Sequence, residues 1–309
     1  MNRWLVMMFA LMILASSCTD NKDFTVTKSG LGYKIFPGNS KDSLKPGNFI
    51  RFRVVQKIED SLLNVPDETP EQFIQVPSQP VEFDLMEIAN KIKIGDSIVY
   101  RLPVDTILAK NQGRQLPPFL KKGKNIFVFV KVLKQYDSAQ VATEDRQKEI
   151  MRIQQVIADK RMAEFNKIAK DKFSDAVKTK GATLVKITKQ GDGPVSDSGK
   201  VVTMKYEGRF AKSGEVFDGN MNQKDTALNK PIEFQLVDGG MMKGWMYAMP
   251  LLRKGAKASF LIPYTEGYGE TGFQTIPPYS NLIFDVEVLD VKDAPQQTIP
   301  NLPPPPTKH

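Results

Sequence analysis

The chain has 309 residues, with 43 Lys and Arg against 35 Asp and Glu, and a formal net charge of +8. Its only cysteine is Cys18 and its only histidine is His309, which excludes an internal disulfide, a Ser-His-Asp triad and a histidine-based zinc site of the usual kind. The positive charge is spread along the sequence without an arginine-rich block, and this distribution argues against nucleic-acid binding.

The N-terminal residues 1–17 are typical of a lipoprotein signal peptide. A positive start precedes an apolar run from Leu5 to Ala15, which is shorter than the roughly 20 residues that a membrane-spanning helix needs. We expect cleavage before Cys18, lipidation of that cysteine, and a polar spacer up to residue 30. Anchored by acyl chains, the protein would be a membrane-bound lipoprotein of the bacterial cell envelope, facing the periplasm or the surface. A short signal anchor, or cleavage without a lipid, is the alternative.

Two β-rich regions, 31–137 and 180–293, are predicted to be copies of one another. Their parallel segments, each given with its counterpart, are PVEFDL at 80–85 and PIEFQL at 231–236, KIGDSIVYRLP at 93–103 and RKGAKASFLIP at 253–263, and the closing strands NIFVFVKVL and NLIFDVEVL. Unrelated strands would not usually preserve such spacings, so the sequence predicts two tandem domains of one fold.

The segment 139–178 between these regions is predicted to be a long amphipathic helix. It contains no Pro or Gly, and its apolar residues recur near a helical period: Ile153, Ile157, Met162, Phe165, Ala169, Phe173 and Ala176. We expect this apolar stripe to pack on one domain, and the alternative is a spacer or a helix that forms a homodimer. The tail 294–309 is proline-rich and is predicted to be disordered or polyproline II, with docking in a partner's aromatic groove as a weaker idea.

The second region contains six ordered segments that carry a family resemblance. Within residues 199–288 they read KYEGRF, GEVFD, PIEFQL, GGMMKGW, EGYGETGFQTIPP and NLIFDVEV. In this order they resemble the FKBP-type peptidyl-prolyl isomerases over about a third of the chain. The resemblance implies an α+β fold with two half-open antiparallel β-sheets, each wrapped on a short helix and joined by the long amphipathic helix. It implies no metal and no cofactor.

The same resemblance implies a set of site residues. Those expected to be catalytic are Asp218, Tyr268, Trp245 and Phe217, and those expected to bind the substrate are Tyr206, Phe234, Met241, Met242, Ile276 and Phe284. Rotation about an X-Pro bond needs no nucleophile, only an apolar surface that excludes water and donors that favour the twisted amide. The two methionines replace the usual Val-Ile pair, so we expect a pocket that adapts to varied residues before the proline. Phe273 stands where small or polar residues are frequent, so we expect a preference for apolar chain segments.

The first region is predicted to lack this site. Val54 and Leu108 stand at the positions of Tyr206 and Tyr268. With PVEFDL aligned to PIEFQL, nine residues are missing where GGMMKGW would fall. We therefore expect a catalytically dead domain of the same fold that binds a partner or client, or that spaces the second domain from the membrane.

The leading hypothesis is a membrane-tethered peptidyl-prolyl cis-trans isomerase that assists the folding of exported proteins. Its partners would be unfolded or Pro-containing polypeptides and, through the lipid, a membrane. The alternative is a non-enzymatic chaperone or assembly scaffold that binds extended or Pro-containing chains.

Overall fold

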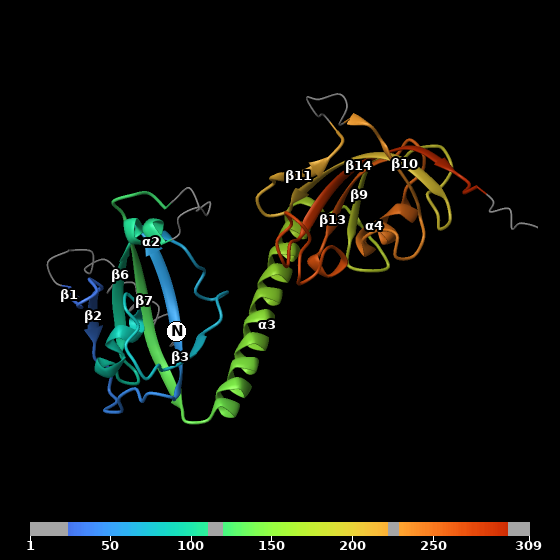
Figure 1. The fold of residues 1–309 in the computed structure, drawn as a ribbon. Coiled ribbons are helices and arrows are strands. Elements are labelled where there is room, and N and C mark those ends of the chain that lie inside the picture. Colours follow the sequence, from blue (N-terminus) through green and yellow to red (C-terminus); the bar gives the residue numbers. More distant parts are fainter. Residues whose placement is uncertain (1–23, 111–119, 222–228, 296–309) are drawn as a thin grey trace, which may run out of the picture. The chain divides into compact units, whose positions relative to one another are not determined.

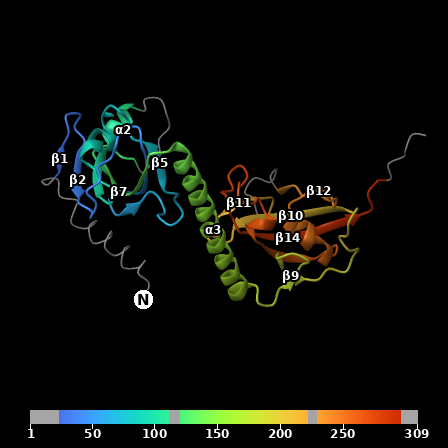
Figure 2. The same cartoon turned by 90° about the horizontal axis from the view of Figure 1, so that it is seen from below.

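The computed structural model describes residues 24–110, 120–221 and 229–295. The predicted signal peptide, the lipidated Cys18 and the tail after residue 295 lie outside these ranges. Within them, no helix is both long enough and apolar enough to span a bilayer. The chain divides into two compact units, Met1–Val156 and Ile157–His309, each built on an antiparallel sheet (Figures 1 and 2).

The first unit contains a seven-stranded antiparallel sheet in the order β1-β2-β6-β7-β3-β4, with β5 also paired to β3. The strands are β1 (Thr25–Val26), β2 (Gly32–Phe36), β3 (Phe49–Ile58), β4 (Ser61–Leu62), β5 (Gln72–Gln75), β6 (Ser97–Pro103) and β7 (Asn125–Tyr136). The short helices are η2 (Leu85–Lys91) and α2 (Val104–Lys110). Strand β1 lies within the stretch 18–30 that the sequence predicted to be a spacer.

The second unit contains a seven-stranded antiparallel sheet in the order β11-β10-β14-β13-β9-β8, with β12 also paired to β10. The strands are β8 (Val177–Lys178), β9 (Leu184–Lys189), β10 (Val201–Phe210), β11 (Val216–Gly219), β12 (Ile232–Gln235), β13 (Lys257–Ile262) and β14 (Leu282–Lys292). Its helices are α4 (Lys243–Ala248), η4 (Met249–Leu251) and η5 (Tyr264–Glu266).

The two sheets have the same topology. Each strand from β1 to β7 has its counterpart seven places later, with the same neighbours in the sheet. The match extends to register, because the long central pairs β3–β7 and β10–β14 each carry one irregularity three residues into the first strand, between Arg51 and Phe52 and between Thr203 and Met204. Shared order and a shared bulge confirm the prediction of two copies of one fold.

One part of the predicted repeat is wrong. Residues 80–85 form no strand, and Phe83 has a φ of 62°. The structural counterpart of β12 is β5, because Gln75 pairs with Phe49 as Gln235 pairs with Val201, at the starts of β3 and β10. The segment that parallels PIEFQL is therefore EQFIQV, not PVEFDL.

The corrected register removes the predicted deletion. Eighteen residues separate Val76 from Gly95, and eighteen separate Leu236 from Gly255. The hydrogen bonds that hold the two segments also correspond, since Gly47 N–H donates to the Val76 carbonyl at 2.9 Å and Gly199 N–H donates to the Leu236 carbonyl at 2.7 Å. The first unit thus keeps the whole length of the segment that carries GGMMKGW, with other residues in it.

A single helix, α3 (Ala139–Lys172), contributes to both units (Figure 1). It is shorter than the predicted 139–178, because β8 begins at Val177. In its N-terminal part Ile153 is buried, and Glu149 and Asp145 bind Arg51 of β3.

The C-terminal part of α3 packs on the second sheet. Phe165 of α3 and Phe173, just beyond its end, are buried against Leu261 of β13 and Ile283 of β14, with Met162 and Ala169 packed alongside. The prediction that the apolar stripe packs on a domain is confirmed for this part. A homodimer through this helix stays a prediction.

Candidate active site

Five aromatic residues meet on one face of the second sheet, and they are called here the aromatic cluster: Tyr206, Phe217, Phe234, Trp245 and Phe284. Trp245 and Phe284 are 1% and 2% exposed and form its floor, with their rings edge to face at 5.1 Å. The other three residues, Tyr206, Phe217 and Phe234, are only half-buried and pack around this floor.

Each ring of the cluster comes from a separate part of the fold. Tyr206 and Phe284 lie on the neighbouring central strands β10 and β14, Phe217 on β11, Phe234 on β12 and Trp245 on α4. Tyr206 and Phe234 contact the indole at centroid distances of 5.5 and 5.9 Å, and Phe217 meets Phe284 edge to face at 5.7 Å. Such tilted pairs suit the quadrupoles of the rings and add to the stabilisation from buried area.

Gly208 of β10 lets the rings of Phe284 and Phe217 lie close to the main chain of this strand. A Cβ atom at this position of β10 would lie 2.7 Å from Phe284 Cε1 and 2.8 Å from Phe217 Cζ. No side chain larger than a hydrogen atom fits there without moving the rings. Sequence reasoning did not single out this glycine; the only available signal was a glycine inside a strand pattern, which marks a close approach of some kind.

The polar edge of the cluster is formed by Tyr206 and Asp218. The Tyr206 hydroxyl donates a 2.7 Å hydrogen bond to Asp218 Oδ2, and the other carboxylate oxygen accepts the N–H of Gly219 at 2.8 Å. Asp218 itself is exposed. Burial and the Asp218 carboxylate both raise the pKa of Tyr206, so the phenol stays a neutral donor at physiological pH.

Asn220 fixes the backbone next to this pair. Its buried side chain accepts the N–H of Tyr206 at 2.7 Å through Oδ1 and donates to the Lys230 carbonyl at 2.9 Å through Nδ2. The N–H of Asn220 in turn donates to the Tyr206 carbonyl at 2.9 Å. Asn220 therefore ties β10 to the segment after Asp218, and sequence reasoning missed it because an asparagine after a strand reads simply as a turn.

The loop from Tyr264 to Ile276 brings Tyr268 and Phe273 to the cluster. Tyr268 is half-buried against it, and burial, followed by the charge of Asp218, raises its pKa. The ring of Phe273 stacks on Tyr268 at 5.4 Å and 10°, yet its side chain is 55% exposed. A pair of backbone hydrogen bonds between Phe273 and Ile276 closes the turn.

The remaining predicted residues also lie at the cluster. Ile276 is buried in the same core, and Met241 and Met242 pack against it, half-buried. The Met242 carbonyl accepts the N–H of Trp245 at 3.1 Å and so begins α4. The structure thus brings all ten predicted residues of the second unit together, and their roles in catalysis stay predictions.

In the first unit, the positions that correspond to four residues of the aromatic cluster carry aliphatic side chains. By strand register, and by the equal spacing to the flanking Val76 and Leu236, the counterparts of Tyr206, Phe234, Trp245 and Phe284 are Val54, Ile74, Leu85 and Val128. All four belong to the core of the first unit or pack against it. The prediction of Val54 opposite Tyr206 is confirmed.

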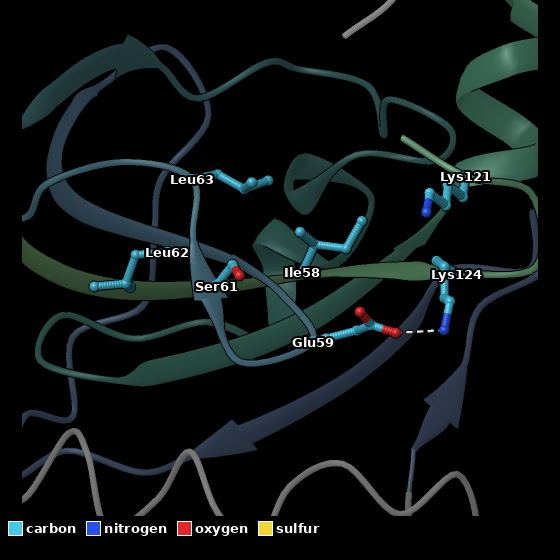
Figure 3. Close-up of a pocket in the computed structure, with 7 residues that line it drawn as sticks. All are labelled: Ile58, Glu59, Ser61, Leu62, Leu63, Lys121 and Lys124. Atoms are coloured by element: carbon cyan, nitrogen blue, oxygen red, sulfur yellow. Dashed lines mark hydrogen bonds and ion pairs between the residues drawn. The ribbon is translucent and has the colours of Figure 1, made fainter. Parts of the chain in front are cut away.

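Two hollows among the described residues lie away from the aromatic cluster. The one in Figure 3 is in the first unit, between the β3–β4 hairpin and the loop before β7. The other is on the face of the second sheet that α3 covers, beside Lys172 and Arg209. The described ranges contain no group of three or more His, Cys, Asp or Glu placed to hold a metal ion.

The part of the chain that carries the aromatic cluster is similar to known proteins. The sequence model of one family, described as FKBP-type peptidyl-prolyl cis-trans isomerase, matches residues 193–289. A probable FKBP-type peptidyl-prolyl cis-trans isomerase of Haemophilus influenzae is 41% identical over 134 residues, which are 43% of this chain and 50% of that protein. The Escherichia coli K12 isomerase FkpA is 35% identical over 131 residues, or 42% of this chain and 44% of that protein.

A longer match is to a probable FKBP-type isomerase FkpA of Neisseria meningitidis, which is 32% identical over 198 residues, 58% of this chain and 70% of that protein. The crystal structure of FkpA from Escherichia coli aligns with a TM-score of 0.41 and 28% identity, covering 50% of this chain and 68% of that one. The chain spans half or less of the length of the first two relatives.

Proposed function

Since this chain belongs to the FKBP-type peptidyl-prolyl cis-trans isomerase family, we propose that its second unit catalyses cis-trans isomerisation of X-Pro bonds in polypeptide substrates. The observation that carries the proposal is the joint placement of a buried indole floor, half-buried aromatic walls and the bonded Tyr206–Asp218 pair at one edge. Uncatalysed, the X-Pro bond rotates over a barrier of about 18–20 kcal/mol because amide resonance is broken on the way.

The aromatic cluster would supply the apolar part of the catalysis. A proline ring seated on Trp245, between Tyr206 and Phe234, removes water from the imide. A twisted amide has lost its charge-separated resonance form and is less polar than a planar one, so an apolar surface binds it better than water does. Binding the twisted state more tightly than the planar one is what lowers the barrier.

The polar groups at the edge would orient the flanking peptide. Tyr268 carries a hydroxyl at the same edge as Asp218, and burial and the Asp218 charge keep its proton in place by raising its pKa. A neutral phenol can donate to a substrate carbonyl and hold the chain on one side of the bond. Asp218 holds Tyr206 by the 2.7 Å hydrogen bond, so the carboxylate acts by positioning and by its field, without proton transfer.

A test measures the rate of cis-trans exchange of a short X-Pro peptide, by NMR exchange or by a protease-coupled assay. The purified protein is expected to accelerate the exchange, and Tyr268→Phe and Asp218→Asn are expected to lower kcat/KM several-fold while leaving the fold intact. Tyr247→Phe and Asp197→Asn are the matched controls: Tyr247 lies outside the cluster, and Asp197, like Asp218, is exposed and accepts the N–H of the next residue. A folded protein that gives no acceleration would contradict the proposal and favour a binding protein without turnover.

We also propose that the protein acts in the bacterial cell envelope, tethered through Cys18, on exported polypeptides. The support is the positive start, short apolar run and small residues before Cys18. Incorporation of a labelled fatty acid in cells, lost in Cys18→Ala, would support the tether. An unlabelled protein recovered from the soluble fraction would contradict it.

A further inference from the structure

The first unit carries an apolar hollow that the isomerase proposal does not use (Figure 3). Three apolar side chains line it, namely Ile58 at the end of β3, Leu62 of β4 and Leu63, which directly follows β4. Leu62 is 50% exposed, although leucine is among the residues most often buried. Lys121 and Lys124 enter from the loop before β7, and Glu59 and Ser61 complete the lining.

The hollow occupies the place in its sheet where the second unit carries Phe210 and, from the aromatic cluster, Phe217. Ile58 pairs with Ile126 at the end of β3, as Phe210 pairs with Leu282 at the end of β10. Phe210 is also the ring that packs against Phe217 of β11, at 5.0 Å. The same corner of the same fold is therefore aromatic in one unit and aliphatic in the other.

The backbone at this corner is open to an extended chain. Strand β4 is the last in the order β1-β2-β6-β7-β3-β4, so within the described sheet it has a neighbour on one side only. The unpaired edge of a strand offers N–H and C=O groups to an added strand, and alternate side chains of that strand then enter neighbouring pockets. An edge strand beside an apolar hollow is thus suited to a polypeptide ligand.

The charges at the hollow fix the kind of polypeptide. Glu59 is the only acidic residue of the lining and is bound to Lys124 in an ion pair, drawn as the dashed line in Figure 3. Lys121 is exposed and forms no ion pair among the residues that the structure describes. An acidic side chain next to the aliphatic one would complement this excess positive charge.

We propose that this hollow is a second polypeptide-binding site, which takes an extended segment with an aliphatic side chain in the hollow and an Asp or Glu beside Lys121. The site needs no proline and carries out no reaction. It would hold a client on the same chain as the aromatic cluster without competing for that cluster. The proposal does not rest on the isomerase activity, because its ligand contains no X-Pro bond.

The experiment uses the full chain and a fluorescein-labelled, proline-free peptide of twelve residues with two leucines flanked by aspartates. Binding is measured by fluorescence anisotropy. We expect saturable binding that Leu62→Asp weakens about tenfold and Lys121→Glu weakens by a similar factor. The matched control is Val65→Asp, a change of the same kind at an equally exposed side chain that does not line the hollow.

Further measurements distinguish binding at this hollow from binding at the aromatic cluster and from self-association. The exchange rate of an X-Pro peptide is expected to be unchanged in Leu62→Asp, because the aromatic cluster lies in the other unit. A urea melt of Leu62→Asp that keeps the parent's transitions shows that the first unit of this variant is folded. Equal binding of a peptide with lysines in place of the aspartates would overturn the proposal, as would a loss of binding in Tyr268→Phe that Leu62→Asp does not share. Self-association of the protein that Leu62→Asp abolishes, without peptide binding, would assign the hollow to a second copy of the chain and would also overturn it.

Discussion

The Tyr206 hydroxyl donates a 2.7 Å hydrogen bond to Asp218 Oδ2. This bond links a half-buried side chain of β10 to an exposed carboxylate of β11. Burial and this bond raise the pKa of Tyr206 above its ordinary value of 10. A phenol with a raised pKa stabilises the fold at every pH below the unfolded value, and this contribution is lost only as the pH rises through the folded value. We therefore expect the exchange rate to be constant from pH 6 to about pH 9.

Tyr206→Phe removes this bond and leaves the aromatic contact with Trp245 in place. We expect kcat/KM to fall several-fold and the free energy of unfolding to fall by about 1 kcal/mol, the usual net value of one hydrogen bond. The measurement is a pair of exchange assays and urea melts beside the parent. A variant with full activity would show that Asp218 needs no partner.

Gly208→Ala should damage the aromatic cluster without changing any functional group. The added methyl would lie within 3 Å of both Phe284 and Phe217, and both rings would have to shift. We expect a loss of about 1–3 kcal/mol in stability, which is typical of overpacking, together with reduced activity. Denaturant melts and a near-ultraviolet circular dichroism spectrum would record both effects. An unchanged spectrum would mean that the sheet moves instead of the rings.

Asn220 is expected to stabilise the fold through the two hydrogen bonds of its side chain. Asn220→Ala leaves the N–H of Tyr206 and the carbonyl of Lys230 without their present partners, and a buried group without a partner costs about 1–3 kcal/mol. Asn220→Asp keeps the acceptor and loses the donor, so it should cost less at the Tyr206 end. Urea midpoints of the two variants test the order. Equal midpoints at or above the parent value would contradict it.

Trp245 combines a large buried ring with an indole N–H that has no acceptor among the described residues. Trp245→Ala should cost about 3–5 kcal/mol, as expected for emptying a buried aromatic site, and can unfold the unit. Trp245→Phe keeps a ring and removes the unsatisfied donor, so we expect a loss below about 2 kcal/mol. Thermal melts compare the two. Phe is thus the safer substitution for activity measurements at this position.

Asp145 should make the first unit sensitive to acid. The Tyr136 hydroxyl donates to its carboxylate, Arg51 Nη1 donates at 2.9 Å, and these two hydrogen bonds lower the pKa of Asp145 below 3.8. A lowered carboxyl pKa contributes stability that is present above the unfolded value and is lost as the pH falls through the folded value. We therefore expect Asp145→Asn to destabilise the unit at pH 7, with the difference from the parent shrinking below about pH 4.

The control for this measurement is Asp60→Asn, an exposed carboxylate in the β3–β4 turn. This substitution removes a negative charge and leaves both hydrogen bonds of Asp145 in place, so the free energy of unfolding should stay close to the parent value. A difference between Asp145→Asn and the parent that persists unchanged at pH 3 would assign the effect to packing instead of charge.

The sequence predicted the aromatic cluster because its residue types and their order survive any small error in strand boundaries. It failed at PVEFDL, because a short match of letters takes no account of pairing partners. Only the pairing of Gln75 with Phe49 shows that EQFIQV is the repeated strand. The shift by nine residues then created a deletion that does not exist.

Gly208 and Asn220 escaped the sequence analysis for a related reason. The role of Gly208 depends on two rings that arrive from β11 and β14, and the role of Asn220 depends on a main-chain carbonyl ten residues further along. Neither neighbour is visible from local composition or period. The helix 139–172 was predictable from its lack of Pro and Gly and its apolar spacing, while its end before β8 depends on sheet pairing.

The helix α3 also decides how the protein can be cut. The family match begins at residue 193, yet Phe165 and Phe173 cover Leu261 and Ile283 on the back of the second sheet. The main chain of the helix is tied there as well, because Asn281 Nδ2 donates to the Arg161 carbonyl at 2.6 Å. A fragment that starts at residue 193 would expose the apolar residues Leu261 and Ile283 on the back of the second sheet and would aggregate. A fragment that starts near residue 157 would keep these contacts, so the smallest autonomous form of the second unit is longer than the family match of residues 193–289.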